Sequence, residues 1–238
     1  MYSNNHLENY QDFLEQFLDK QYEFVNFQQL NKPYKQIVMR HDIDFDCQAA
    51  LDLARIEHKL DIASTYFFLL SNDSYNPLSK QNMERILEIK ELGHTISIHF
   101  DPTIYKDFEQ GFEQEKAIFE TLFQTKIDII SLHRPNEFFL KFDQKFSGVE
   151  HTYMQKYFKD FDYFSDSTGL WRFGHPFNSE AFKLSKSLHV LIHPIWWVIE
   201  GQDNFNKLKS YYQVKKDELK KHYSDNCLPF IQIANELD

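Results

Sequence analysis

Cysteine and glycine are both scarce in this sequence. Its 238 residues include two cysteines and six glycines. Two cysteines, Cys47 and Cys227, are too few for a disulfide framework, which fits a reducing compartment. The chain also lacks internal repeats, low-complexity tracts and linkers rich in Pro, Gly and Ser. We therefore expect one main domain with its own core.

Long apolar runs are absent as well. A membrane-spanning helix needs roughly 20 consecutive apolar residues, and the longest candidate, 190–199, is interrupted by His193 and Pro194. Residues 1–18 are polar and acidic, whereas a secretory signal has a basic start followed by an apolar run. The sequence thus predicts no membrane span and a cytoplasmic location.

Basic residues are outnumbered. Lys and Arg total 26 against 36 Asp and Glu, a net charge of -10. Nucleic-acid binding requires concentrated Lys and Arg, so we expect no nucleic-acid partner, and an anionic membrane surface is also disfavoured. What the chain does have is aromatic residues, 17% of the total. These fit a Phe-rich core first and a sugar-binding surface second.

Strand and helix patterns alternate along most of the chain. Apolar residues at helical spacing over 6–30 predict an N-terminal helix that ends before Pro33. The expected strands are 36–44, 63–70, 95–100, 127–133, 163–166 and 189–193, and the expected later helices are 47–60, 79–92, 103–125 and 204–223. This alternation predicts an α/β fold with a parallel sheet, either open or closed into a barrel. We expect a helical extension over 1–33 and a main domain over 34–238.

Ionisable residues stand where these strands end. They are Asp42 and Asp44 after the first strand, His99 and Asp101 after the third, His133 and Arg134 after the fourth, Asp166 after the short fifth, and His193 after the last. The carboxyl ends of parallel strands meet at one rim, so residues remote in sequence should converge there.

The convergence suggests metal-assisted hydrolysis. Asp42 and Asp44 are two apart on an extended segment and point to the same side. Two such carboxylates repel unless one is protonated or a cation lies between them. A bound metal ligated by one of them, with His99 as a nitrogen ligand, would leave the other free to take a proton from water. His193 has the right ordinary pKa for a general acid.

Each residue also has a plainer interpretation. Asp42 and Asp44 could cap the following helix, and His99 could be a hydrogen-bonded core residue. His133 and Arg134 could form a surface pair, and Trp196 and Trp197 could belong to the core. Their joint occurrence at strand ends makes the functional interpretation the better one.

The ordered motifs resemble those of the polysaccharide deacetylases, the NodB-like carbohydrate esterases of family 4. The matching segments are 40–44 (RHDID), 91–99 (ELGHTISIH), 134–135 (RP), Asp166 and 191–194 (LIHP), and together they span roughly 36–197. The resemblance implies a distorted parallel (β/α) barrel, NodB-like, preceded here by the helical extension. The Asp-x-Asp and Ile-His-Pro motifs contribute most to the resemblance.

The resemblance also implies residue roles. Asp42 would be the general base, held in place by Arg134. His193 would be the general acid, fixed by Asp166. Asp44 and His99 would bind a divalent metal, with Zn²⁺ as the expected ion.

One position departs from the family pattern. The family usually has a second metal-binding His four residues after the first, and Thr103 stands there. His133 is the first candidate for the third ligand, Asp101 the second, and Thr103 or a further water the third. His94 matches a family His that usually does not bind metal. His41 replaces an apolar residue and would line the pocket or support the metal site from outside.

These features predict a metal-dependent deacetylase acting on an amide nitrogen of a carbohydrate, either an N-acyl amino sugar or its nucleotide- or lipid-linked precursor. One alternative is a metal-dependent phosphoesterase on a related barrel, which would hold two or three metals. Another is a non-catalytic carbohydrate-binding relative, motivated by Thr103. Metal stoichiometry and release of acetate discriminate among the three.

Overall fold

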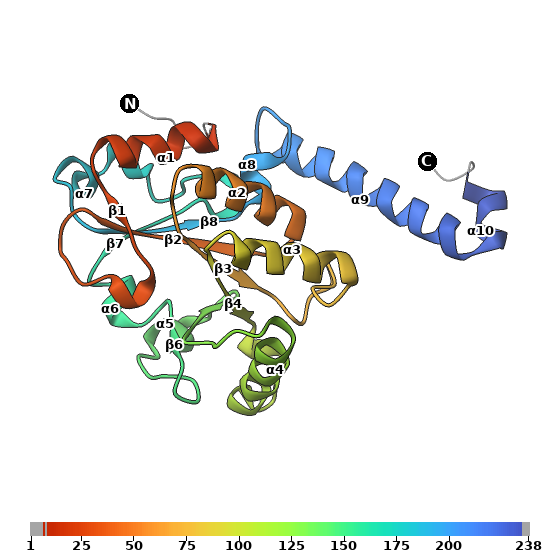
Figure 1. Ribbon diagram of the computed structural model, residues 1–238, viewed down its shortest axis with the longest axis horizontal. Helices are drawn as coiled ribbons and strands as arrows, with labels where there is room; N and C mark the ends of the chain where they lie inside the picture. Colours follow the sequence, from red (N-terminus) through yellow and green to blue (C-terminus); the bar gives the residue numbers. More distant parts are fainter. Residues whose placement is uncertain (1–6, 8, 235–238) are drawn as a thin grey trace. The chain divides into compact units, whose positions relative to one another are not determined.

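The computed structural model describes residue 7 and residues 9–234, and these divide into two compact units, up to Val198 and from Ile199 onward. All strands belong to the first unit (Figure 1). The strands are β1 (Glu23–Phe24), β2 (Gln36–Ile43), β3 (Thr65–Phe68), β4 (Thr95–Phe100), β5 (Ile129–Leu132), β6 (Glu150–His151), β7 (Asp162–Ser165) and β8 (Leu188–Ile192). The helices of this unit are α1 (Tyr10–Asp19), α2 (Cys47–Lys59), α3 (Lys80–Glu91), α4 (Phe108–Phe123), α5 (Glu137–Lys141), α6 (Gln155–Phe158), α7 (Glu180–Lys183) and α8 (Ile195–Val198).

The sheet is parallel throughout and curls into a partly open barrel. Its strand order is β6-β5-β4-β3-β2-β8-β7, with β1 added beside β2. Among the described residues no ladder joins the two end strands, β6 and β7, so the barrel is not closed. Helices α1, α2 and α3 follow one another along one side of the sheet (Figure 1). This architecture confirms the distorted parallel (β/α) barrel.

Strand β2 lies at the centre of the sheet and carries the Asp-x-Asp motif at its end. All eight of its residues are buried. It pairs with β3 through residues 40–43 and with β8 through residues 37–41. Backbone hydrogen bonds on both edges fix its path up to the rim, so the side chains at its end start from a rigid base.

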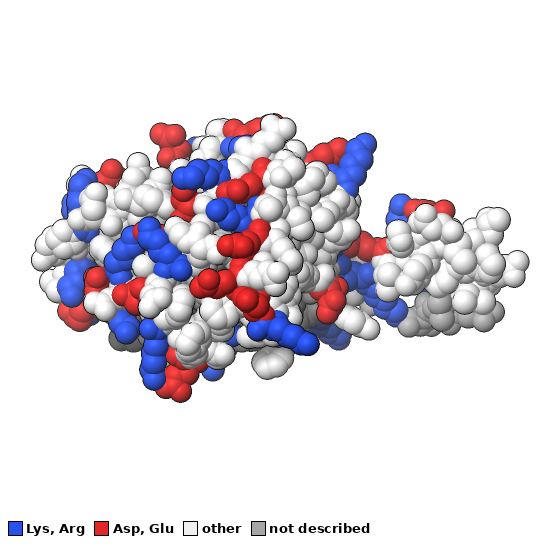
Figure 2. Space-filling model, turned by 90° about the horizontal axis from the view of Figure 1, so that it is seen from below, with Lys and Arg blue, Asp and Glu red and all other residues white. Residues whose placement is uncertain are grey.

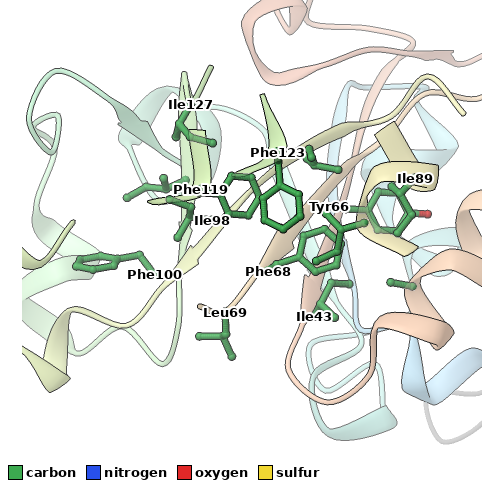
Figure 3. Packing of buried hydrophobic residues seen from close by; sticks show 14 of the residues in the cluster. Ile43, Tyr66, Phe68, Leu69, Ile89, Ile98, Phe100, Phe119, Phe123 and Ile127 are labelled. Atoms are coloured by element: carbon green, nitrogen blue, oxygen red, sulfur yellow. The ribbon is translucent and has the colours of Figure 1, made fainter. Parts of the chain in front are cut away.

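The apolar core lies on both faces of the sheet. Its largest cluster joins outward-facing strand residues to the inner faces of α2, α3 and α4, including Tyr66, Phe68, Ile89 and Phe119 (Figure 3). On the inward face a second cluster contains Phe27, Val38 and Phe67. Because Val38, residue 40 and residue 42 alternate to the same face of β2, this inward cluster lies below the rim groups and fills the barrel interior beneath them.

The N-terminal helix is shorter than the expected span of 6–30, whose first residue lies outside the described ones. Helix α1 ends at Asp19, and Gln21 then takes a left-handed conformation (φ 61°) that stops helical hydrogen bonding. The chain continues as β1 and a short 3-10 helix, Phe27–Gln29. The buried residues of α1 belong to the first unit. The domain boundary expected at residue 33 stays a prediction. The division into compact units falls elsewhere, after Val198.

The second unit is helical. It contains α9 (Asn204–Asn226), expected as 204–223, and α10 (Leu228–Ile233). Within the described residues we find no helix with the length and apolar character needed to cross a membrane.

On the face in Figure 2, Lys and Arg side chains alternate with Asp and Glu. That face therefore offers no extended basic patch for nucleic acid.

A buried polar cluster centred on Glu57 ties α1 and α2 to the sheet. Its carboxylate accepts hydrogen bonds from Tyr10 Oη at 2.5 Å and Tyr66 Oη at 2.6 Å, and His41 Nε2 lies 2.7 Å away. Burial and the nearby carboxylate raise the pKa of both tyrosines well above the usual value, so both stay hydroxyl donors. Burial alone would raise the pKa of Glu57, but His41, then the nearby His94, and then Tyr10 more than offset it, and the pKa is lowered. We name Tyr10, His41, Glu57 and Tyr66 the Glu57 cluster.

Glu57→Gln should destabilise the fold. The glutamine amide lacks the negative charge of the carboxylate, to which Tyr10, His41 and Tyr66 all hydrogen-bond. Its NH₂ group would also face one of these three donors. The expected loss in the free energy of unfolding is about 3 kcal/mol, measured by urea titration. Glu88→Gln is the matched control on a neighbouring helix, because the Glu88–Arg55 pair is largely exposed (39% and 47%) and worth at most about 1 kcal/mol. Equal losses for the two variants would contradict the prediction.

Candidate metal and hydrolytic site

Asp42 is held at the end of β2 by a buried arginine. Its side chain is 3% exposed and that of Arg40 is fully buried. Arg40 donates from Nε to Oδ1 at 2.9 Å and from Nη2 to Oδ2 at 2.6 Å. Ser131 on β5 donates to the same Oδ2 at 3.0 Å. Burial alone would raise the pKa of Asp42, but the charges of Arg40 and then His99 outweigh it and lower the pKa. Asp42 therefore stays ionised.

Asp44 lies beside two histidines from other strand ends. Its Oδ1 is 3.3 Å from His99 Nε2 and 3.5 Å from His133 Nδ1, and the two ring nitrogens are 3.0 Å apart. Each of the three residues offers one ligand atom, and these atoms all lie within 4.8 Å of one another. Oδ1 is buried and accepts no hydrogen bond among the described residues. Burial would raise the pKa of Asp44, but His133 and His99 bring it well below the usual value.

The other expected ligands are engaged elsewhere. Asp101 Oδ1 accepts from the backbone N–H of Thr103 at 2.9 Å and from its hydroxyl at 2.6 Å, which caps a short 3-10 helix. Helix α2 is capped by Asp46, which accepts from two backbone N–H groups of its first turn. The capping interpretation of Asp42 and Asp44 is therefore wrong. Of the candidates for a third ligand, only His133 joins Asp44 and His99 in the described site.

His193 is fixed on the other side of the site by Asp166. Its Nδ1 lies 2.6 Å from Asp166 Oδ1, and its backbone N–H donates to the same carboxylate at 3.0 Å. Burial lowers the pKa of His193, but the negative charge of Asp166 and this hydrogen bond more than compensate and raise it to about 9. Since Nδ1 bonds to Asp166, the proton available to a substrate is on Nε2.

Trp197 completes the support of this pair. Its Nε1 donates to Asp166 Oδ2 at 2.7 Å. The indole ring packs against Tyr10 and Phe13 of α1, with ring centroids 5.2 and 4.9 Å away. The N-terminal helix thus contacts the residue that anchors Asp166.

The two halves of the site face each other across one cavity. His193 Nε2 is 3.9 Å from Asp44 Oδ2, and His99 Nε2 is 3.7 Å from Asp42 Oδ2. The cavity is lined by Asp42, Asp44 and His193, together with Ile43, Phe45, Asp46, Pro194 and Ile195. The structure therefore brings six of the seven predicted site residues together: Asp42, Asp44, His99, His133, Asp166 and His193.

Arg134 is the seventh, and the structure does not bring it to Asp42. Its side chain is exposed, its backbone is left-handed (φ 45°), and no hydrogen bond or ion pair of Asp42 in the described chain involves it. This left-handed residue directly follows His133, and its side chain is exposed to solvent instead of contacting Asp42. Arg40 occupies the place expected for Arg134. Sequence reasoning missed Arg40, Ser131 and Trp197, although Arg40 lies two residues before Asp42 on a strand and so had to share its face.

The remaining histidines near the motifs face away from the cavity. His41 points outward into the Glu57 cluster, so it does not line the pocket. His94 is buried, with Nδ1 accepting from the backbone N–H of Ser64 at 3.2 Å and Nε2 facing the carbonyl of Ala54 at 2.9 Å. This pattern assigns His94 a neutral tautomer with a packing role.

Comparisons with known proteins give distant likenesses only. No family model matches the sequence, and no curated protein matches it. Among solved structures, the deacetylase PplD of Streptococcus pyogenes shows 14% identity over 88% of this chain and 95% of its own, with a TM-score of 0.43. A family 4 carbohydrate esterase from Bacillus anthracis shows 12% identity over 97% and 99%, also at 0.43.

A third structure is a family 4 pseudoenzyme from Bacillus anthracis, with 12% identity over 77% of this chain and 62% of its own and a TM-score of 0.41. These names agree with the family that the motifs resemble, but at such low scores the likeness carries no weight on activity. The case for a function has to rest on the site itself.

Proposed function

We propose that this chain is a metal-dependent hydrolase that removes an acyl group, acetyl in the first instance, from the amide nitrogen of an amino sugar or sugar precursor. One observation carries the proposal: the buried carboxylate of Asp42, the Asp44 carboxylate of a three-residue ligand set and the aspartate-fixed His193 all line one cavity. Amide hydrolysis needs these three components, namely a base, an electrophilic centre and an acid for the departing amine.

The ligand set suits a divalent cation such as Zn²⁺. It offers two imidazole nitrogens and one carboxylate oxygen, the donor types that zinc prefers. The two ring nitrogens are 3.0 Å apart and can share one N–H, but Asp44 Oδ1 is buried without a hydrogen-bond partner among the described residues. A cation bound by all three atoms would compensate the charge of this carboxylate. When bound, the metal would lower the pKa of a water and polarise the substrate carbonyl.

The remaining steps belong to the side chains of the protein. Asp42 is ionised and beside the ligand set, so it accepts the proton of the attacking water. His193 is on the opposite side of Asp44 and carries a proton on Nε2, which it gives to the amine as the carbon–nitrogen bond breaks. Asp166 keeps the ring in the required tautomer and supports its positive charge.

The direct test combines metal analysis with product release. Metal-free protein would be reloaded with Zn²⁺ and its metal content measured, and acetate would be assayed with N-acetylglucosamine oligomers and nucleotide-linked N-acetyl sugars. About one metal per chain and acetate release support the proposal. Two or three metals with phosphate-ester cleavage would favour a phosphoesterase. Sugar binding without acetate release would favour a non-catalytic protein.

Asp166→Asn should shift the alkaline limb of the activity profile to lower pH. His193 acts in its protonated form, so activity is lost as the pH rises through its pKa. Removing the carboxylate charge lowers that pKa from about 9, and the limb moves with it. We also expect kcat to fall by roughly 100-fold. A kcat profile against pH measures both effects.

Asp162→Asn provides the control, since Asp162 lies at the start of the same strand, β7, on the exposed side. Its profile should match that of the unmodified protein. An unchanged alkaline limb in Asp166→Asn would contradict the role given to Asp166.

A further inference from the structure

We infer that Arg40 is the positioning residue of the proposed base Asp42, a role that the motif pattern had pointed to in Arg134. The inference rests on the proposed function, because positioning matters only if Asp42 takes a proton. It concerns an arginine on the same strand as the base.

The geometry of the pair is that of a two-point clamp. Both side chains alternate to the inner face of β2, with Arg40 one layer deeper in the barrel. Its Nε and Nη2 each donate to a different oxygen of Asp42, at 2.9 and 2.6 Å. Two parallel hydrogen bonds from a planar guanidinium fix the plane of the carboxylate as well as its position.

Residues from other parts of the barrel hold the guanidinium in turn. Ser131 on β5 hydrogen-bonds to both Arg40 Nη2 and Asp42 Oδ2. The guanidinium carbon lies 4.9 Å from the ring centroid of Tyr153 and 6.0 Å from that of Phe67. In the described part of the chain, Asp42 is the one carboxylate that forms an ion pair with this fully buried guanidinium, and the enclosure keeps the guanidinium from turning towards solvent.

The clamp leaves the base able to work. An ionised carboxylate has about four acceptor positions. Arg40 takes one on each oxygen and Ser131 takes a second on Oδ2, which leaves a position on Oδ1 for the incoming proton. Arg134, with an exposed side chain beyond the rim, contributes none of these contacts.

Matched variants test the inference. Arg40→Met keeps much of the buried volume but removes the clamp, and kcat should fall by about 100-fold with KM and zinc stoichiometry unchanged. Arg40→Lys restores the charge without the two-point geometry, so it should recover only part of the activity. Arg134→Met should stay within about threefold of the unmodified protein. The reverse ranking, with Arg134→Met impaired and Arg40→Met active, would overturn the inference.

A stability cycle gives a readout that needs no substrate. In metal-free protein, Arg40→Met and Asp42→Asn should each lower the Tm, because each leaves a buried group without its partner. The double variant should be less destabilised than the sum of the two. Additive changes in Tm would overturn the clamp whatever the activity. If the unmodified protein released no acetate while the cycle remained non-additive, the proposed function would fail and the clamp would stand.

Discussion

Asp42→Asn should abolish turnover and leave the metal in place. The amide cannot take a proton from water, and general-base catalysis is worth roughly 100- to 10,000-fold in rate. The ligand set of Asp44, His99 and His133 is untouched, so zinc content should stay at the level of the unmodified protein. Acetate release and elemental analysis on the same sample would measure both.

The surroundings of Asp42 add a second expected effect. Arg40 is fully buried and has its charge balanced by this carboxylate. A neutral amide leaves the guanidinium uncompensated, and breaking a buried pair costs about 3 kcal/mol or more. Activity would therefore be assayed well below the lowered Tm. Asp52→Asn, a similar change on a half-exposed face of α2, is the control and should alter neither activity nor metal content. Full activity in Asp42→Asn would refute its role as the base.

His133→Ala should release the metal, whereas Thr103→Ala should not. Loss of one of three protein ligands should weaken zinc binding by more than about 100-fold, the upper range seen when only an outer-shell partner is lost. Thr103 hydrogen-bonds to Asp101 and does not belong to the ligand set found among the described residues. Competition with a chelator of known affinity would measure the dissociation constants.

The comparison of these two variants decides which residue replaces the missing family histidine. His133→Ala should also lose activity, with recovery only at high zinc concentration. If Thr103→Ala lost the metal and His133→Ala kept it, the assignment of His133 as the third ligand would be wrong.

Much of the site could be predicted because parallel topology follows from the alternation of strands and helices. Once the strands are parallel, their carboxyl ends share a rim, and residues as distant as Asp44 and His193 must approach each other. No fine detail of packing was needed. The same rule left the third ligand open, since several strand-end residues were near enough, and only the structure shows that Asp101 is hydrogen-bonded to Thr103.

The errors have physical causes of a different kind. The helix predicted over 6–30 was too long, because apolar periodicity does not detect a single left-handed residue such as Gln21. No helix or strand was expected within 134–161, because α5, β6 and α6 are five, two and four residues long, too short for a period to show. Arg40 was overlooked because a resemblance drew attention to Arg134, although spacing along β2 placed Arg40 beside Asp42.

The Glu57 cluster has a consequence for how related sequences should differ. A carboxylate enclosed by Tyr10, His41 and Tyr66 tolerates the loss of none of them singly, since each exchange strands a polar group in the interior. Homologues should therefore keep all four residues or exchange them as a block, for example with Leu at positions 41 and 57 and Phe at positions 10 and 66. Linked variation at these positions would mark the relatives in which the N-terminal helix is built into the barrel in the same way.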